Sequence, residues 1–295
     1  VLGGYDLTPD MQFFVLDDRI RFKPSGVLGP LRLPEPPYLI GPKAYYPPPL
    51  PRELSARVTI PADMPAGPVR WQAANANGSS QTGLFVVGNG TEIVENEDRS
   101  GPQRLEGRPV TVSGRLRHNE EVDFYRIRAE RDGPITCALA ARGIGSPFNG
   151  VIEVHNSQGR LIDDAVDSRG CDAVLTFAAV AGEEYTIAAR DLDFRGHLSF
   201  VYRLTIDDAP RVLAAIPAAG RRGETRDVEF VGIGLKTGAA ELESVTRPIA
   251  FPADPAAAHL DYRLETPFGT AAAYRLLLSH LTEVVEDAKT AERPV

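Results

Sequence analysis

Acidic side chains are concentrated in two short stretches of the sequence, where carboxylates could bind a metal ion. They are Glu95, Glu97 and Asp98 in the first stretch and Asp163, Asp164, Asp167 and Asp172 in the second. Neighbouring carboxylates repel one another unless a cation or an arginine lies between them. Ca²⁺ takes roughly six to eight oxygen ligands at flexible geometry, so either stretch could supply part of a calcium site. The alternative is a set of solvated turn aspartates that pair in part with Arg160, Arg169 and Arg190.

Residues typical of catalytic sites occur without the spacing that catalysis needs. The histidines are isolated from one another in sequence, which gives little support for a zinc site. Ser146 lacks the Gly-x-Ser-x-Gly elbow of a nucleophilic serine. Gly232, Gly234 and Gly238 superficially resemble a dinucleotide-binding loop, but no helix pattern follows them. The sequence therefore predicts a protein that is not an enzyme.

Several aromatic residues lie in polar or proline-rich stretches and could contact a partner. They are Tyr45, Tyr46, Phe148 and Phe194. A ring in an exposed loop can stack on a sugar or anchor a protein partner. Such residues more commonly pack into the core or against a loop, and that alternative stays open.

The balance of charge bears on the class of partner. The chain has 295 residues, with 40 Asp plus Glu against 32 Lys plus Arg. This acidic balance argues against nucleic acid or an anionic membrane surface as a partner. No run approaches the ~18 consecutive apolar residues that span a bilayer, so we expect a chain that is not membrane-spanning. Protein partners or extracellular polysaccharide are the expected ligands, and the chain could belong to a larger assembly.

The two cysteines, Cys137 and Cys171, both fall in the central part of the chain. The sequence leaves two states open. One is a disulfide between them, and the other is a pair of reduced, buried thiols.

Short alternating runs bounded by turn residues predict an all-β fold. In the central part of the chain they lie at residues 123–127, 135–141, 150–155, 172–178, 184–190 and 202–206. This spacing is typical of a compact antiparallel sandwich. The proline-rich residues 34–51 instead predict an extended loop, because proline removes the donors of a β-ladder.

The sequence contains an internal repeat, in which residue 61 matches residue 252 at an offset of 191. The matches pair Pro61-Ala-Asp with Pro252-Ala-Asp, Trp71 with Tyr262, Gly78-Ser with Gly269-Thr, and Thr91-Glu-Ile-Val-Glu with Thr282-Glu-Val-Val-Glu. A constant offset predicts one structural plan used twice. The chain begins at Val1 without a start methionine or an apolar leader, so we expect either a removed signal peptide or a part of a longer array.

A series of landmarks runs in order through the central part of the chain. They are Gly114-Arg-Leu, Glu121-Val-Asp-Phe-Tyr-Arg, Val154-His-Asn-Ser-Gln-Gly, Ala181-Gly-Glu-Glu-Tyr-Thr, Arg190-Asp-Leu-Asp-Phe-Arg-Gly and Tyr202-Arg-Leu. Their order resembles the bacterial pre-peptidase C-terminal domain, a secreted β-sandwich module, over roughly residues 92–207. The sequences of these landmarks look most like those of the domain in large secreted or envelope proteins of planctomycete-like bacteria.

The flanking segments resemble the immunoglobulin-like (IPT/TIG-type) modules of bacterial secreted proteins. The resemblance lies in the turn Pro65-Ala-Gly, the aromatic strand around Trp71 and the hairpin signal Asn77-Gly78-Ser79. We therefore predict tandem antiparallel β-sandwiches. Their boundaries would be an Ig-like sandwich at 1–90, a jelly-roll-like pre-peptidase-type sandwich at 91–207, a second Ig-like sandwich at 208–282, and a linker into a further repeat at 283–295.

The resemblance to the pre-peptidase C-terminal domain also implies a ligand and a function. Relatives can hold calcium with carboxylates of the segment that leads into the sandwich, although Arg99 here stands where the family often has a ligand. The calcium candidates are Glu95, Glu97, Asp98, Asp123, Asp163 and Asp164. The expected function is a non-catalytic spacer and interaction protein outside the cytoplasm, whether periplasmic, on the cell surface or secreted. The alternatives are a carbohydrate- or matrix-binding module attached to a secreted hydrolase, and a structural subunit of an envelope complex.

Overall fold

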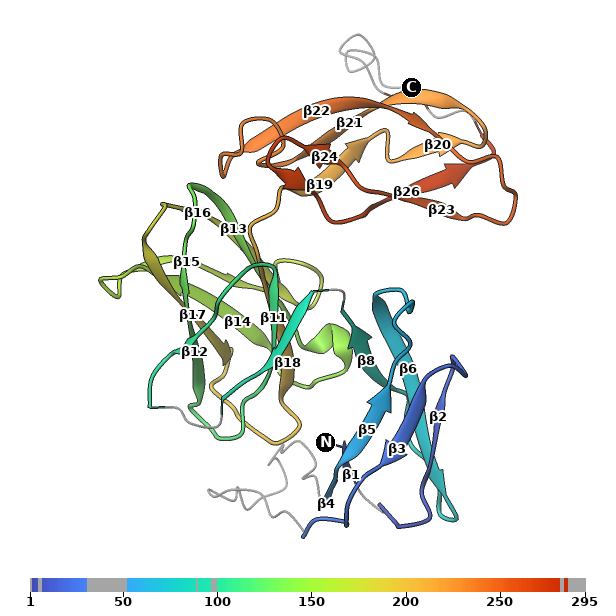
Figure 1. Cartoon of the computed structure of the whole chain (residues 1–295), viewed down its shortest axis with the longest axis vertical. Helices are drawn as coiled ribbons and strands as arrows, with labels where there is room; N and C mark the ends of the chain where they lie inside the picture. Colours follow the sequence, from blue (N-terminus) through green and yellow to red (C-terminus); the bar gives the residue numbers. More distant parts are fainter. Residues whose placement is uncertain are drawn as a thin grey trace. The chain divides into compact units, whose positions relative to one another are not determined.

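The chain is built from β-strands (Figure 1). The computed structural model describes residues 2–4, 7–30, 52–88, 90–96, 100–281 and 284–285. Within these ranges the regular elements are strands, apart from one short 3₁₀ turn, η1 (Arg142–Ile144). The predicted all-β fold is confirmed. The proline-rich residues 34–51 lie outside the described residues.

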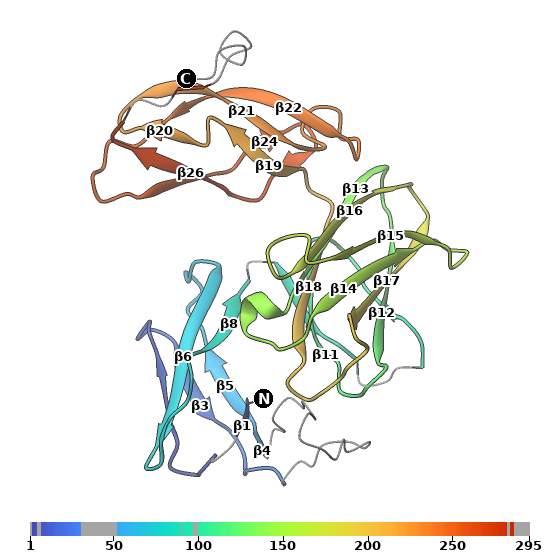
Figure 2. The ribbon, with the colours of Figure 1, turned by 180° about the vertical axis from the view of Figure 1, so that it is seen from behind.

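The central part of the chain forms two five-stranded sheets (Figure 2). The first has the order β10 (Gln103–Arg104), β12 (Val122–Arg128), β17 (Glu184–Asp191), β14 (Gly150–His155) and β15 (Leu161–Val166). The second has the order β16 (Ala173–Ala179), β13 (Gly133–Ala140), β18 (Val201–Asp207), β11 (Val110–Arg115) and β9 (Thr91–Val94). Neighbours such as β12 and β17 are antiparallel, whereas β9 lies parallel to β11 and β10 parallel to β12.

Alternation along the strands places the core between these two sheets. In β12, the side chains of Asp123, Tyr125 and Ile127 are buried, while Phe124 and Arg128 are exposed. Successive side chains of a strand point to opposite faces, so this pattern fixes which face is inside. The phenol of Tyr125 meets the phenol of Tyr202 on β18 at 2.6 Å, a hydrogen bond that joins the two sheets.

The N-terminal module consists of one long strand, β6, and several shorter ones, with few fully buried side chains. They are β1 (Leu2–Gly4), β2 (Gln12–Val15), β3 (Arg21–Pro24), β4 (Arg52–Leu54), β5 (Ala56–Thr59), β6 (Gly67–Asn75), β7 (Gly78–Ser79) and β8 (Gly83–Val87). Strand β6 pairs with β2, β7 and β8, while β3 pairs with β5 and β1 with β4. The rings of Phe13, Phe22 and Trp71 stack on one another, with Phe22 5.5 Å from Trp71.

The C-terminal module has two three-stranded sheets and a small hairpin. The sheets are β19 (Arg211–Ile216), β21 (Thr225–Ile233) and β22 (Leu242–Ala250), and β20 (Ala219–Arg221), β26 (Tyr274–Ser279) and β23 (His259–Tyr262). The hairpin is β24 (Glu265–Thr266) with β25 (Gly269–Thr270). Val228, Phe230 and Leu276 are fully buried at the centre of the core of this module. Phe230 stacks on Tyr262 with ring centroids 5.2 Å apart.

The strand registers of the two flanking modules agree with the sequence repeat. In the N-terminal module Trp71 lies opposite Gly83, and at the offset of 191 Tyr262 lies opposite Tyr274. The hairpin residues agree as well, since Asn75 pairs with Gly78 and Thr266 pairs with Gly269. The second half of each module is therefore the same supersecondary plan, as the repeat predicts.

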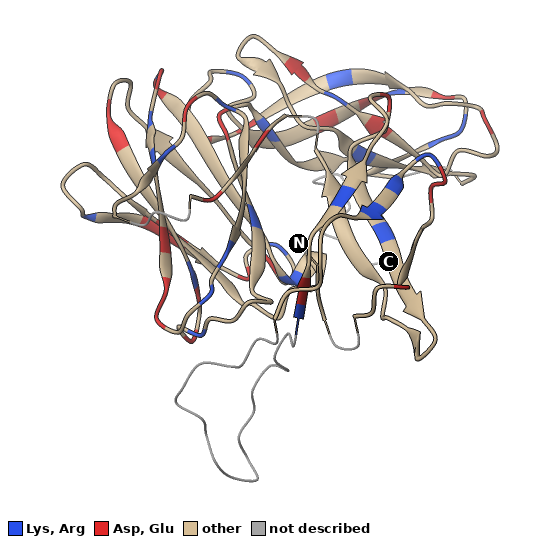
Figure 3. Cartoon of the chain, turned by 60° about the horizontal axis from the view of Figure 1, so that its bottom comes forward, with Lys and Arg blue, Asp and Glu red and all other residues tan. Residues whose placement is uncertain are grey.

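The chain divides into two compact units. The first comprises residues 1–128, 137–175 and 184–206, and the second comprises residues 129–136, 176–183 and 207–295. The predicted boundaries at residues 90, 207 and 282 stay a prediction. Figure 3 shows acidic and basic segments interspersed along the strands and loops.

Candidate metal centre

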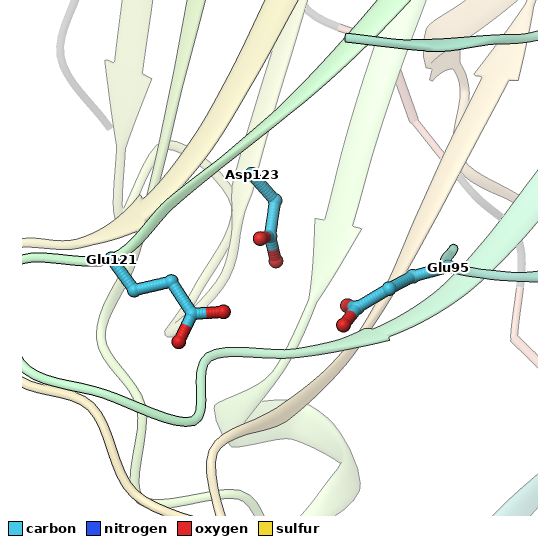
Figure 4. Close-up of side chains that lie close together, drawn as sticks. All are labelled: Glu95, Glu121 and Asp123. Carbon is cyan, nitrogen blue, oxygen red and sulfur yellow. The ribbon is translucent and has the colours of Figure 1, made fainter. Parts of the chain in front are cut away.

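Three carboxylates converge at one end of the central sandwich. The ligand oxygens of Glu95, Glu121 and Asp123 all lie within 4.8 Å of one another. Figure 4 shows the three side chains pointing toward a common point. Glu95 follows the end of β9, Glu121 precedes β12, and Asp123 lies on β12. The cluster therefore brings together segments of both sheets.

Backbone N–H groups fix the two glutamates. Glu121 accepts hydrogen bonds through Oε2 from the backbone N–H groups of Arg117 (2.6 Å) and His118 (2.7 Å). Glu95 accepts one through Oε2 from the N–H of Arg115, at the end of β11 (2.6 Å). Backbone donors to a carboxylate are strong, charge-assisted bonds, so both side chains have defined orientations.

The aspartate is held from the core side. Asp123 is buried, with 6% of its surface exposed. The phenol of Tyr202 donates to Asp123 Oδ2 at 2.5 Å. Because that bond uses the only proton of Tyr202, the phenol of Tyr125 is the donor in the bond between the two tyrosines. The pKa of Tyr202 is raised well above its usual value, first by burial and then by the neighbouring Tyr125 and Asp123.

A glycine makes room for the tyrosine that holds Asp123. Gly114 on β11 lies directly opposite Tyr202 on β18. A Cβ atom at Gly114 would lie 2.3 Å from Cζ of the Tyr202 ring. The ring therefore lies over the glycine, and a side chain at residue 114 would displace it.

The arrangement fits a calcium ion. Calcium–oxygen distances are about 2.3–2.6 Å, so oxygens on opposite sides of one ion lie within about 5 Å of each other, in agreement with the observed separation. Carboxylate oxygens are hard ligands that suit Ca²⁺ or Mg²⁺ rather than the metals that prefer thiolate or imidazole. A pocket of about 90 Å³ adjoins the cluster and is lined in part by Asn96, Gly101 and Gln103. It has room for a few water molecules, which could complete the coordination.

The structure brings together some of the carboxylates predicted from the sequence and separates others. Glu95 and Asp123 belong to the cluster, whereas Glu97 and Asp98 lie outside the described residues. Asp163 and Asp164 are exposed on β15, at an edge of the first sheet, and strands β14 and β17 separate them from β12. Those two aspartates therefore belong to no common site with Asp123.

Sequence reasoning missed Glu121 as a ligand candidate. The signal was present, because Glu121 and Asp123 are two residues apart in Glu121-Val-Asp. Residues at this spacing in a strand lie on the same face. What the sequence could not give was the approach of Glu95, which depends on the parallel pairing of β9 with β11.

Two other acidic groups, Asp172 and Asp191, have structural partners. Asp172 accepts hydrogen bonds from the N–H groups of Ala141 (2.9 Å) and Gly143 (3.2 Å), and so holds the turn η1 against residues 169–172. Asp191 is fully buried and accepts from the backbone of Asn149 and from the guanidinium of Arg195. Both carboxylates therefore hold parts of the fold together, and that of Asp191 also forms an ion pair with Arg195.

The predicted aromatic contacts have different outcomes. The prediction that Phe148 contacts a partner is wrong, because its ring is 0% exposed and packs against Phe200 and Tyr202 in the core. The short loop after η1 turns this side chain inward, where its apolar area is removed from water. Phe194 is 45% exposed, and the guanidinium of Arg190 lies 4.5 Å from its ring centroid. Tyr45 and Tyr46 lie outside the described residues.

The disulfide alternative for Cys137 and Cys171 is wrong, because both are free thiols in the structure. Cys137 is buried on β13, and burial raises its pKa to about 12. Cys171 is exposed, so the alternative of two buried thiols holds for Cys137 alone.

Comparisons with known proteins give similarities at low identity. No protein-family model and no curated protein matches the chain. One similar solved structure is the pre-peptidase C-terminal domain of collagenase from Bacillus anthracis, at 16% identity over 38% of this chain and 100% of that chain, with a TM-score of 0.30. A second is a periplasmic inhibitor of g-type lysozyme from Salmonella Typhimurium, at 14% identity over 40% of this chain and 98% of that chain, with a TM-score of 0.25. A third is tripeptidyl peptidase 2, at 9% identity over 76% of this chain and 18% of that chain, with a TM-score of 0.23.

The first of these structures is the kind of domain that the central sequence resembles. The identity and TM-score are low, and the family therefore remains a prediction for this chain. Among the described residues, no helix has the length and apolar character needed to cross a membrane.

Proposed function

We propose that this chain is a non-catalytic spacer and interaction protein of the extracytoplasmic space, and that calcium stiffens its central sandwich. The observation that carries the calcium proposal is the convergence of Glu95, Glu121 and Asp123 within 4.8 Å. The β-sandwich architecture supplies a rigid body whose loops can present side chains to a partner.

The position of the cluster explains what an ion would do. Glu95 continues from β9, which belongs to the sheet of β11, whereas Asp123 lies on β12 in the other sheet. One ion bound to both side chains would cross-link the two sheets at the end of the sandwich. It would also fix the chain at residue 95, directly after β9, which is the first strand of the sandwich in chain order.

Electrostatics favours a cation at this place. Like charges held close together oppose ionisation, and a divalent ion relieves that repulsion. The hydrogen bonds described above orient one oxygen of each carboxylate. The hydrogen-bonded oxygens keep the side chains in place with or without the ion.

Partner binding would use the exposed end loops of the sandwich. Phe194 offers a half-exposed ring backed by Arg190, and Arg190 is itself held by Glu153 at 2.7 Å. An aromatic ring beside a fixed guanidinium is a common contact in protein interfaces. The same pair could stack on a sugar, which is the feature that favours the carbohydrate-binding alternative.

Thermal unfolding of the full chain with Ca²⁺ and with a chelator tests the calcium proposal. With a dissociation constant typical of extracellular modules, about 10 mM Ca²⁺ should stabilise the chain by roughly 1–3 kcal/mol, seen as a saturating rise in Tm. Glu95→Gln should abolish the rise, because glutamine keeps an acceptor for the Arg115 N–H but loses the charge. The matched control is the double variant Asp163→Asn with Asp164→Asn, which should keep the full rise. No rise in the wild-type chain, or an equal rise in Glu95→Gln, would contradict the proposal.

A further inference from the structure

The longest edge strand of the C-terminal module has one unoccupied side. Strand β22 pairs along its whole length with β21, in an unbroken register from Leu242 opposite Ile233 to Ala250 opposite Thr225. Among the described strands, none pairs with its other side. A regular edge of this length offers a row of backbone donors and acceptors to another strand.

The hydrogen bonds at its two ends show which residues face that side. The carbonyl of Glu241 accepts from the N–H of Gly234, and the N–H of Phe251 donates to the carbonyl of Glu224. Both bonds continue the pairing with β21. On the β22 side they involve the odd-numbered residues Glu241 and Phe251. Because backbone groups alternate along an antiparallel strand, the even-numbered residues, including Ser244 and Thr246, direct their backbone N–H and C=O groups to the unoccupied edge.

Proline and arginine positions agree with this assignment. Pro248 falls on the outward-facing set, where its missing N–H costs no bond to β21. The guanidinium of Arg247 donates to the carbonyl of Thr246 at 3.0 Å, which places its charge at the open edge. The side chain of Leu242, also on the outward-facing set, is 68% exposed.

From Glu243 to Arg247, the sequence of β22 is complementary to itself when reversed. It reads Leu-Glu-Ser-Val-Thr-Arg-Pro from residue 242 to residue 248. An antiparallel pairing centred on Val245 places Glu243 of each copy opposite Arg247 of the other. It also places Ser244 opposite Thr246, so that these outward-facing residues exchange their backbone hydrogen bonds. The Glu243 carboxylate also accepts from the backbone N–H groups of Lys236 and Thr237 in its own chain. Opposite charges on directly facing residues stabilise such a pair.

We propose that β22 is a homodimer interface, in which two copies of the chain pair antiparallel about a two-fold axis at Val245. The partner is a second copy because the reversed strand places opposite charges, and Ser244 and Thr246, opposite each other. Such an isologous contact closes after two subunits, and each copy covers the edge of the other. The result is one continuous six-stranded sheet across the two C-terminal modules.

Sedimentation equilibrium of the full chain tests the proposal over a range of concentrations. The wild-type chain should form a species of twice its 31.9 kDa mass. Thr246→Pro removes an outward-facing N–H from each copy and should weaken the dimer at least about tenfold. Arg247→Glu places like charges opposite each other and should weaken it to a similar degree, at least about tenfold, without a backbone change.

The matched control is Arg263→Glu, which makes the same change of charge at an exposed residue away from β22. It should leave the dimer intact. A wild-type chain that remains a 31.9 kDa monomer at every concentration overturns the proposal. A dimer that Arg247→Glu does not weaken overturns it as well, and that variant gives the answer even if Thr246→Pro does not fold.

Discussion

Two buried aspartates of the central sandwich, Asp191 and Asp123, have different neighbouring groups. Asp191 accepts from the backbone N–H groups of Asn149 and Asp193 at 3.0 Å and from the guanidinium of Arg195 at 3.0 and 3.1 Å. Asp123 accepts from Tyr202 and lies beside two further carboxylates, those of Glu95 and Glu121. A buried carboxylate that an arginine neutralises is part of the scaffold. One that is grouped with like charges is the better candidate for a ligand.

The largest predicted effect concerns the scaffold aspartate. Asp191→Ala leaves the buried N–H donors and the Arg195 guanidinium without their acceptor, which should lower the free energy of unfolding by about 3–4 kcal/mol. Urea denaturation measures this loss. The control is Asp193→Ala, because the Asp193 side chain is 68% exposed, and it should change stability by no more than about 0.5 kcal/mol. Equal losses in the two variants would remove the distinction between a scaffold aspartate and a surface one.

The second effect concerns the support of Asp123. Gly114→Ala places a Cβ atom 2.3 Å from the Tyr202 ring, so the ring must move away from its position over the glycine. Overpacking of this kind should cost about 1–3 kcal/mol in the same denaturation experiment. Gly101→Ala is the control, since a Cβ there meets nothing within 4 Å. A neutral Gly114→Ala would show that Tyr202 does not depend on the glycine.

The third and smallest effect concerns the hydroxyl of Tyr202. Tyr202→Phe removes the donor to Asp123 and should cost about 1–2 kcal/mol near neutral pH. The folded-state pKa of Tyr202 is raised, chiefly by burial, so its contribution to stability is complete below the ordinary pKa of about 10 and is lost as the pH rises through the folded-state value. The wild-type chain should therefore lose stability above about pH 10 more steeply than Tyr202→Phe. Identical pH profiles would contradict this assignment.

The fold was predictable from the sequence to the extent that period-two patterns determine strands. The run 123–127 became β12 (Val122–Arg128), and 184–190 became β17 (Glu184–Asp191). Apolar residues alternate clearly there because one face of each strand is buried. Strand β15 was not predicted, since its residues 161–164 are all exposed and carry no such alternation.

The candidate metal centre was predictable only in part. Glu95 was identified from a resemblance and Asp123 from its landmark, but their meeting requires β9 and β12 to lie in facing sheets. Asp163 and Asp164 were as plausible in sequence, and only the strand order separates them from the cluster. Phe148 shows the same limit for aromatics, because a ring in a loop can turn into the core. Patterns give the elements, whereas tertiary pairing determines which side chains meet.

Isothermal titration of Ca²⁺ into the full chain tests the central claim most directly, because it measures binding rather than stability. The cluster predicts one site per chain in the wild type and in the variant Asp163→Asn with Asp164→Asn. It predicts no binding at the same concentrations in Glu121→Gln, which keeps an acceptor for the N–H groups of Arg117 and His118 but lacks the charge. A wild-type chain that binds no Ca²⁺, or a Glu121→Gln chain that binds it unchanged, would contradict the assignment of Glu95, Glu121 and Asp123 as a calcium centre.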